Sequence, residues 1–246
     1  LERLNNIFSG KATRNAAGVN TGIQFVLAQY NPAGELMDEP GINRVTVEEV
    51  TEGTPPDKYH RFLSQNNAIW PHEKYLNIWL MSETKYPKFW NSITKLCVPK
   101  YRLGSETLPG LSLPPVPSTW VPKVEQIGIL FRMSTFQYFQ RSIDATAERE
   151  LVTCIGNYLG LLDTWNDQCN DTFAYGIVNN NGSLGTNSSW SKEVGSYRFL
   201  SENIMDDPTG THRSVSKDQA LRMYWVLKNC AGRSMWQSDF ALTGKE

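Results

Sequence analysis

Histidine and cysteine, the side chains behind most zinc sites and many nucleophilic sites, are scarce in this chain of 246 residues. The three histidines are His60, His72 and His212, and the four cysteines are Cys97, Cys154, Cys169 and Cys230. No cysteine pair has C-x-x-C spacing, so we do not expect a structural zinc knuckle. No histidine stands in a recognisable catalytic spacing.

Each of these residues also has a plain structural interpretation. His212 lies in a polar loop at 209–213, where we expect it to be solvated, and His60 and His72 fit surface loops equally well. A Cys169–Cys230 disulfide is compatible with an oxidising compartment, but the spacing alone does not establish it. Cys154 could act as a nucleophile only with a lowered pKa and a nearby base, so we expect a small buried residue.

The element that would position Cys154 is a helix predicted over residues 145–162. Apolar side chains recur there at intervals of three and four residues, at Leu151, Ile155, Tyr158 and Leu162. This periodicity is typical of a helix with one buried face.

The segment Leu151–Trp165 (LVTCIGNYLGLLDTW) resembles the zinc helix of metzincin metallopeptidases, whose pattern is H-E-x-x-H-x-x-G-x-x-H. In that family two histidines four residues apart share one helix face, and a glycine lets the chain turn toward a third. Gly160 stands at the turn glycine, and its neighbours are similar to the pappalysin-like branch of the family. The three histidine positions hold Thr153, Asn157 and Asp163, and the position of the catalytic glutamate holds Cys154.

These replacements remove the chemistry that the resemblance would otherwise imply. Threonine hydroxyl and asparagine amide oxygens are poor zinc donors, and Asp163 alone would not hold the ion against water. Cys154 points about 100° away from Thr153 around the helix, so it is not expected to take over as a ligand. We therefore expect no bound zinc, no other metal and no activated water at this site.

The resemblance continues on both sides of the helix, over about residues 20–230. Asn203–Asp206 looks like the Met-turn, whose methionine, here Met205, underlies the zinc in metzincins. The sequence at 214–223 is similar to the closing helix of that family. Residues 20–27, 40–45 and 74–79 resemble the amino-terminal strands of zinc-dependent metalloproteinase lipoproteins from Bacteroides-type bacteria.

The remaining elements predict an α+β fold with strands first and helices later. Strands are predicted at 21–30, 43–47, 74–81 and 125–132, and the strand at 74–81 reads as buried on both faces. The first twenty residues are weakly helical, a helix capped by Ser216 is predicted over 216–230, and irregular segments are expected at 86–122 and 179–191. The resemblance implies a metzincin-like fold: a twisted mixed sheet with an active-site helix in an upper lobe (1–160), and an irregular lower lobe (161–246) that ends in a helix, the two forming one domain.

Composition excludes several classes of function. The 24 basic residues nearly balance the 25 acidic ones, so no strong field would attract nucleic acid. No apolar run approaches the roughly 20 residues that span a bilayer, and the first residues lack the apolar region of a signal peptide. The resemblance nevertheless implies an exported protein, periplasmic or lipid-anchored at the cell surface, whose signal is absent from this sequence.

Together these observations predict an inactive metallopeptidase homologue that binds a peptide or protein in a retained cleft near Thr153, Asn157 and Asp163. Two alternatives remain open: a hydrolase that uses an unconventional site, and a structural subunit of a surface assembly. The sequence does not indicate an oligomeric state.

Overall fold

The computed structural model describes residues 1–14, 16–45, 63–81, 95–98, 127–132, 146–162, 164, 167, 169–172, 176–179, 190–199, 202–206, 212–230 and 232–245. In chain order its elements are α1 (Glu2–Phe8), β1 (Ile78–Met81), β2 (Lys95–Val98), β3 (Gly128–Arg132), α4 (Thr146–Tyr158), β4 (Gly176–Asn179), β5 (Trp190–Val194), β6 (Tyr197–Phe199), α5 (Lys217–Asn229), the 3₁₀ helix η5 (Ser234–Gln237) and α6 (Phe240–Thr243). Within these ranges every helix is too short or too polar to cross a membrane.

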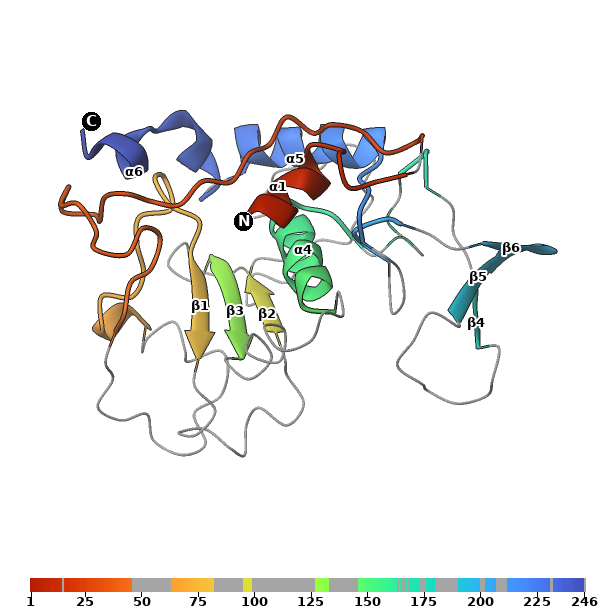
Figure 1. Cartoon of the computed structure of the whole chain (residues 1–246), viewed down its shortest axis with the longest axis horizontal. Helices are drawn as coiled ribbons and strands as arrows, with labels where there is room; N and C mark the ends of the chain where they lie inside the picture. Colours follow the sequence, from red (N-terminus) through yellow and green to blue (C-terminus); the bar gives the residue numbers. More distant parts are fainter. Residues whose placement is uncertain are drawn as a thin grey trace.

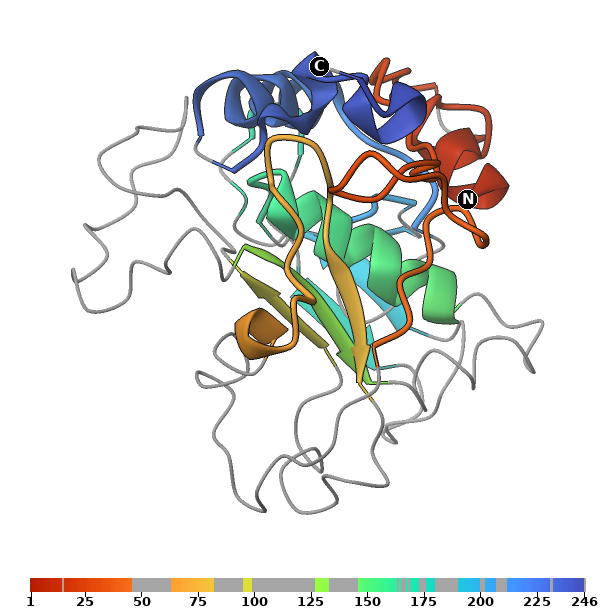
Figure 2. The same cartoon turned by 90° about the vertical axis from the view of Figure 1, so that its left-hand side faces the viewer.

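A mixed sheet with the strand order β1-β3-β2 lies beside α4 (Figures 1 and 2). β1 runs parallel to β3, with Ile78 opposite Ile129, and β2 runs antiparallel to β3, with Cys97 opposite Ile129. β2 therefore lies at one edge of this sheet as described, and it contacts α4 directly. β3 lies within the strand predicted at 125–132, so that prediction is confirmed.

Helix α4 ends earlier than its apolar pattern predicts. The amide of Leu161 donates to the carbonyl of Gly156 (2.9 Å) and that of Gly160 donates to Asn157 (3.0 Å), which is the Schellman pair of hydrogen bonds. Gly160 adopts φ +85°, a left-handed conformation that glycine reaches without a Cβ penalty. The glycine thus ends the helix at Tyr158, and Leu159 and Leu162 are buried beyond it.

Helix α5 confirms the helix predicted over 216–230. Ser216 accepts a hydrogen bond from the amide of Gln219, and the Gln219 side chain accepts one from the amide of Ser216, which completes a capping box. The apolar side of α5, including Met223 and Val226, is buried.

The main core joins elements from both ends of the chain. Its buried members come from α1, β3, α4, the turn at 203–206 and α5, and they include Phe8, Ile129, Ile155, Met205 and Met223. The division into lobes at residue 160 remains a prediction.

Several strand predictions are wrong. Residues 21–30 form no strand: the amide of Thr21 donates to Phe8, and that of Phe25 donates to the side chain of Asn5, so α1 takes the place of a neighbouring strand. Residues 43–45 are also not in a strand, and 46–47 lie outside the described residues. The strand predicted at 74–81 begins only at Ile78, and one face of it is exposed, because Ile78 and Leu80 are 40% and 37% accessible.

Four short strands were not predicted. β2 falls within the proline-rich segment at 86–122, and the antiparallel sheet β4-β5-β6 begins just before the loop expected at 179–191. Figure 1 shows this second sheet standing away from the β1-β3-β2 sheet. Residues 180–189 lie outside the described ranges.

Candidate functional site

Met205 lies directly against α4 at Gly156. A Cβ atom built on Gly156 would lie 2.4 Å from Met205 Sδ and 3.5 Å from Ile204 Cδ1, so only glycine allows this approach. Met205 itself is fully buried. The sequence signal for both residues was their place in the metzincin-like pattern.

The turn that presents Met205 is held by side-chain hydrogen bonds. Asn203 Oδ1 accepts from the amide of Met205 (2.9 Å), and Asp206 Oδ2 accepts from the amide of Asn203 (3.2 Å). Thr164 ties this turn to the chain beyond α4: its hydroxyl donates to Asp206 Oδ1 (2.6 Å) and its amide donates to the carbonyl of Met205 (3.2 Å). These bonds fix the turn against the end of the helix.

A buried polar network extends from this turn to α5. Gln219, which is fully buried, exchanges hydrogen bonds with the side chain of Asn203 (2.8 and 3.1 Å) and donates to Asp167 Oδ2 (3.2 Å). Arg222 donates to the carbonyl of Asp167 (2.6 Å). These hydrogen bonds connect the Met205 turn to α5 and help to hold it in place.

The hydroxyl group of Thr153 forms hydrogen bonds within the protein. Its hydroxyl donates to the carbonyl of Ile204 (2.9 Å) and lies 3.1 Å from His212 Nδ1. Because the single hydroxyl proton goes to the carbonyl, Nδ1 of His212 must be the donor in the second contact. Thr153 therefore links α4 to the Met205 turn through Ile204 and to the chain beyond the turn through His212.

The expectation that His212 is solvated is wrong. The side chain is 4% exposed, and the backbone at His212 has φ +49°, in the left-handed region that few residues other than glycine adopt. This conformation turns the imidazole inward toward Thr153. No spacing pattern in the sequence indicates a contact between residues 59 positions apart.

Asn157 lies one helical turn beyond Thr153 on the same face of α4. Its side chain is 7% exposed, and Oδ1 accepts no hydrogen bond from any residue in the described ranges. A buried acceptor without a donor lowers the free energy of unfolding by about 1–3 kcal/mol, so this amide oxygen is a destabilising group in the site. Cys154 is 1% exposed and belongs to the apolar core, whereas Asp163 lies outside the described residues.

The donor set at these positions does not fit a zinc ion. Thr153 offers a hydroxyl that is already hydrogen-bonded and Asn157 offers a neutral amide, whereas zinc takes imidazole, thiolate or carboxylate. Among the described residues no three histidine, cysteine or acidic side chains gather in a way that could hold a metal.

Other candidate residues are structural. His72 is buried, which corrects its interpretation as a surface residue, and its Nδ1 lies 3.4 Å from Asn77 Nδ2. His60 lies outside the described residues. Cys169 and Cys230 are both buried and neither is in a disulfide, so the bridge left open by the sequence is not formed.

The Cys169 thiol is expected to be unreactive in the folded protein. Burial raises its pKa from 9.0 to about 12, and nearby carboxylates add to this effect against the opposing charge of Arg222. Iodoacetamide at pH 8 should therefore leave Cys169 unmodified in the native protein and alkylate it in urea, as peptide mass mapping would show.

The same shift predicts a loss of stability in alkali. Between pH 9 and 12 the unfolded chain releases the thiol proton while the folded chain retains it, so the free energy of unfolding falls as the pH rises. A Cys169→Ala variant should lack this part of the decrease, and an identical alkaline profile would contradict the prediction.

Comparison with solved structures identifies the architecture. Mirolysin in complex with compound 9 superimposes with a TM-score of 0.59 at 18% identity, covering 100% of this chain and 89% of the other. Mature mirolysin of Tannerella forsythia in complex with a cleaved peptide gives a TM-score of 0.56 at 18% identity, covering 100% and 88%. The fold is that of a metzincin-type metallopeptidase. No protein-family model and no curated protein sequence matches the chain.

The predicted α+β, metzincin-like fold class is therefore confirmed. Helix α4 is the element that the sequence resemblance implies as the active-site helix, and Met205 of the turn at 203–206 lies against it at Gly156. The similarity supports a metallopeptidase fold but not the pappalysin-like branch of it.

Proposed function

We propose that this metzincin-type protein binds a peptide or protein segment without cleaving it. The observation that carries the proposal is Asn157, whose buried amide oxygen lacks a donor within the described part of the chain. A bound segment that supplied an N–H group to this oxygen would offset the cost of burying it. Asn157 stands where the resembling family has a zinc-binding histidine. The same face of α4 would therefore contact the bound segment.

Strand β2 supports binding of an extended segment. It pairs with β3 along one edge and with no other described strand, and it contacts α4. An extended peptide can add to such an edge through main-chain hydrogen bonds. One of the mirolysin structures contains a cleaved peptide.

The absence of cleavage in this proposal rests on the side chains at the site. Cys154, at the position of the catalytic glutamate in the resembling family, is packed in the core, and Thr153 is held by Ile204 and His212. Neither side chain is placed to polarise a water molecule.

Export and a lipid anchor belong to the same proposal and rest on the sequence resemblance. Metabolic labelling of the protein with palmitate would test the lipid anchor.

Asn157→Leu provides the test of the proposed site. Leucine has a similar volume and removes the unsatisfied oxygen, so the free energy of unfolding should stay equal or rise by about 1 kcal/mol. Binding of peptides from a limit digest of casein to the immobilised protein should fall at the same time. Backbone N-methylated copies of the retained peptides should also bind weakly, because they lack the N–H groups that would form main-chain hydrogen bonds with β2.

Leu221→Ala is the matched control, because Leu221 is an exposed residue of α5 outside the site. It should leave peptide retention unchanged. Undiminished retention by folded Asn157→Leu protein would refute the proposed site. Stoichiometric zinc in protein purified without chelator, together with phenanthroline-sensitive cleavage of casein, would refute the inactive function.

A further inference from the structure

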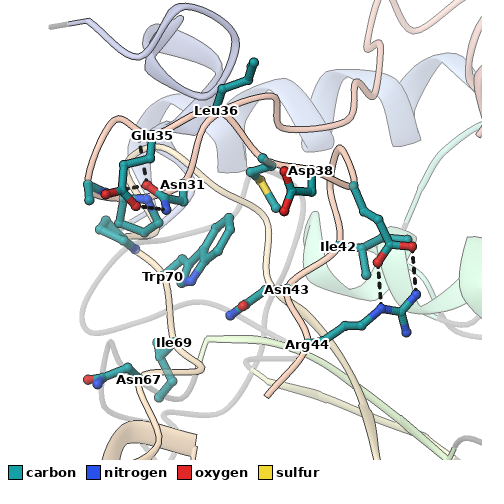
Figure 3. A pocket seen from close by; sticks show the side chains of 15 residues that line it. Asn31, Glu35, Leu36, Asp38, Ile42, Asn43, Arg44, Asn67, Ile69 and Trp70 are labelled. Atoms are coloured by element: carbon teal, nitrogen blue, oxygen red, sulfur yellow. Dashed lines mark hydrogen bonds and ion pairs between the residues drawn. The ribbon is translucent and has the colours of Figure 1, made fainter. Parts of the chain in front are cut away.

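A groove with a volume of about 740 Å³ lies between residues 31–44 and residues 67–71 (Figure 3). Pockets that hold small ligands commonly measure about 300–1,000 Å³, so a single side chain would fill only part of this groove. We call it the N-terminal groove. It adjoins the segment that leads into β1, at the opposite edge of the sheet from β2, and neither Thr153 nor Asn157 lines it.

The wall formed by residues 31–44 belongs to a loop that closes on itself. The amide of Gly41 donates to the carbonyl of Ala28 (2.7 Å), and that of Met37 donates to Gln29 (2.8 Å). Helix α6 fastens the base of the loop, because the carbonyl of Ala241 accepts from Gln29 and Tyr30 (2.7 and 3.1 Å). Compact loops with joined ends are often functional.

The opposite wall presents the indole ring of Trp70. Asn77 fixes the backbone of Trp70 by donating to its carbonyl (2.8 Å) and accepting from its amide (3.0 Å). The indole packs edge-on against Tyr75, with ring centroids 4.8 Å apart. A ring held in this way loses little conformational entropy when a ligand covers it.

The charges around the groove favour a cation. Glu39 and Arg44 neutralise each other through a two-pronged contact of 2.6 and 2.9 Å. Glu35 and Asp38 remain negative; Glu35 accepts one hydrogen bond from Asn31 (2.8 Å), and Asp38 has no ion pair within the described part of the chain. Figure 3 shows the Trp70 ring standing between the parts of the loop that carry these two carboxylates.

We propose that the N-terminal groove binds a lysine or arginine side chain of a partner peptide or protein. The aliphatic stem of that side chain lies along Trp70, and its cationic end is attracted by the π face of the indole and by Asp38 and Glu35. An anionic group would meet the carboxylates of Asp38 and Glu35, and the guanidinium of Arg44, the one cationic group among the described lining residues, is already taken by Glu39. The groove is therefore a second recognition site, separate from the one on α4.

Isothermal titration of the full chain with tri-lysine amide tests the proposal. We expect saturable one-to-one binding that weakens with added salt, because the contact is largely electrostatic. Asp38→Asn, Glu35→Gln and Trp70→Leu should each weaken it by at least about fivefold. A tri-peptide of Nε-acetyl-lysine, which keeps the stem and loses the charge, should not bind.

Glu2→Gln is the matched control, since Glu2 is an exposed carboxylate on α1 outside the groove. It should bind tri-lysine as the unchanged protein does. Incorporation of 5-fluorotryptophan, with the Trp70 signal assigned from a Trp70→Phe variant, should show that resonance shifting on titration. Equal affinity in all three groove variants, a static Trp70 resonance, or no saturable binding would overturn the proposal.

Discussion

A Gly156→Ala variant should lose about 1–3 kcal/mol of folding free energy, as for other overpacked cores. Inside an ordinary helix the same change would gain up to about 1 kcal/mol. Here the new methyl group would lie 2.4 Å from Met205 Sδ, and Met205 has little room to move because it is fully buried. Urea unfolding followed by circular dichroism would measure the difference.

The sign of this effect should reverse when Met205 is shortened. Met205→Ala alone should cost about 2–5 kcal/mol through the cavity that it leaves. In that background Gly156→Ala should be neutral or stabilising, because its clash is gone and helix propensity remains. Additive losses in the double variant would mean that the helix and the turn do not meet as described.

A variant with Thr153→His, Asn157→His and Asp163→His should take up zinc stoichiometrically. Residues 153 and 157 share one face of α4, Gly160 already makes the sharp turn, and Met205 lies against the helix, so the backbone described up to Leu162 suits the ligand pattern. Cys154 is best left unchanged, because a glutamate in that core position would bury a charge. Metal analysis after dialysis against zinc measures the outcome.

His212 provides an internal comparison for the zinc variant. Its Nδ1 lies 3.1 Å from Thr153 Oγ1, so an imidazole at 153 would compete with it for space. Adding His212→Ser should therefore strengthen zinc binding by about 10-fold, the scale of effects around a metal site. A control with His212→Ser and Asn157 retained keeps only the two introduced imidazoles and should release the metal. A folded triple variant that binds no zinc, with or without His212→Ser, would contradict the geometry.

The sequence by itself was sufficient where structure depends on near neighbours. The apolar spacing of α4, the Ser216 cap of α5 and the turn at Gly160 are local patterns, and each produced its element, although Gly160 ends α4 before the last residue that the apolar spacing predicts. The metzincin-type fold followed from motifs that combine such local patterns in a fixed order. The replacements at Thr153, Cys154 and Asn157 could be read directly from the residue types.

Only the tertiary structure decided which distant residues meet. Residues 21–30 look like a strand, yet their hydrogen-bond partners in the described ranges include α1 and α6 and no strand. Strand propensity reflects fit to a neighbouring surface, and the local sequence does not determine that surface. The same holds for His212, which reaches Thr153 across 59 positions, and for the N-terminal groove, whose walls join two separate segments. Such contacts arise from the packing of distant segments, and the spacing of residues along the chain does not predict them.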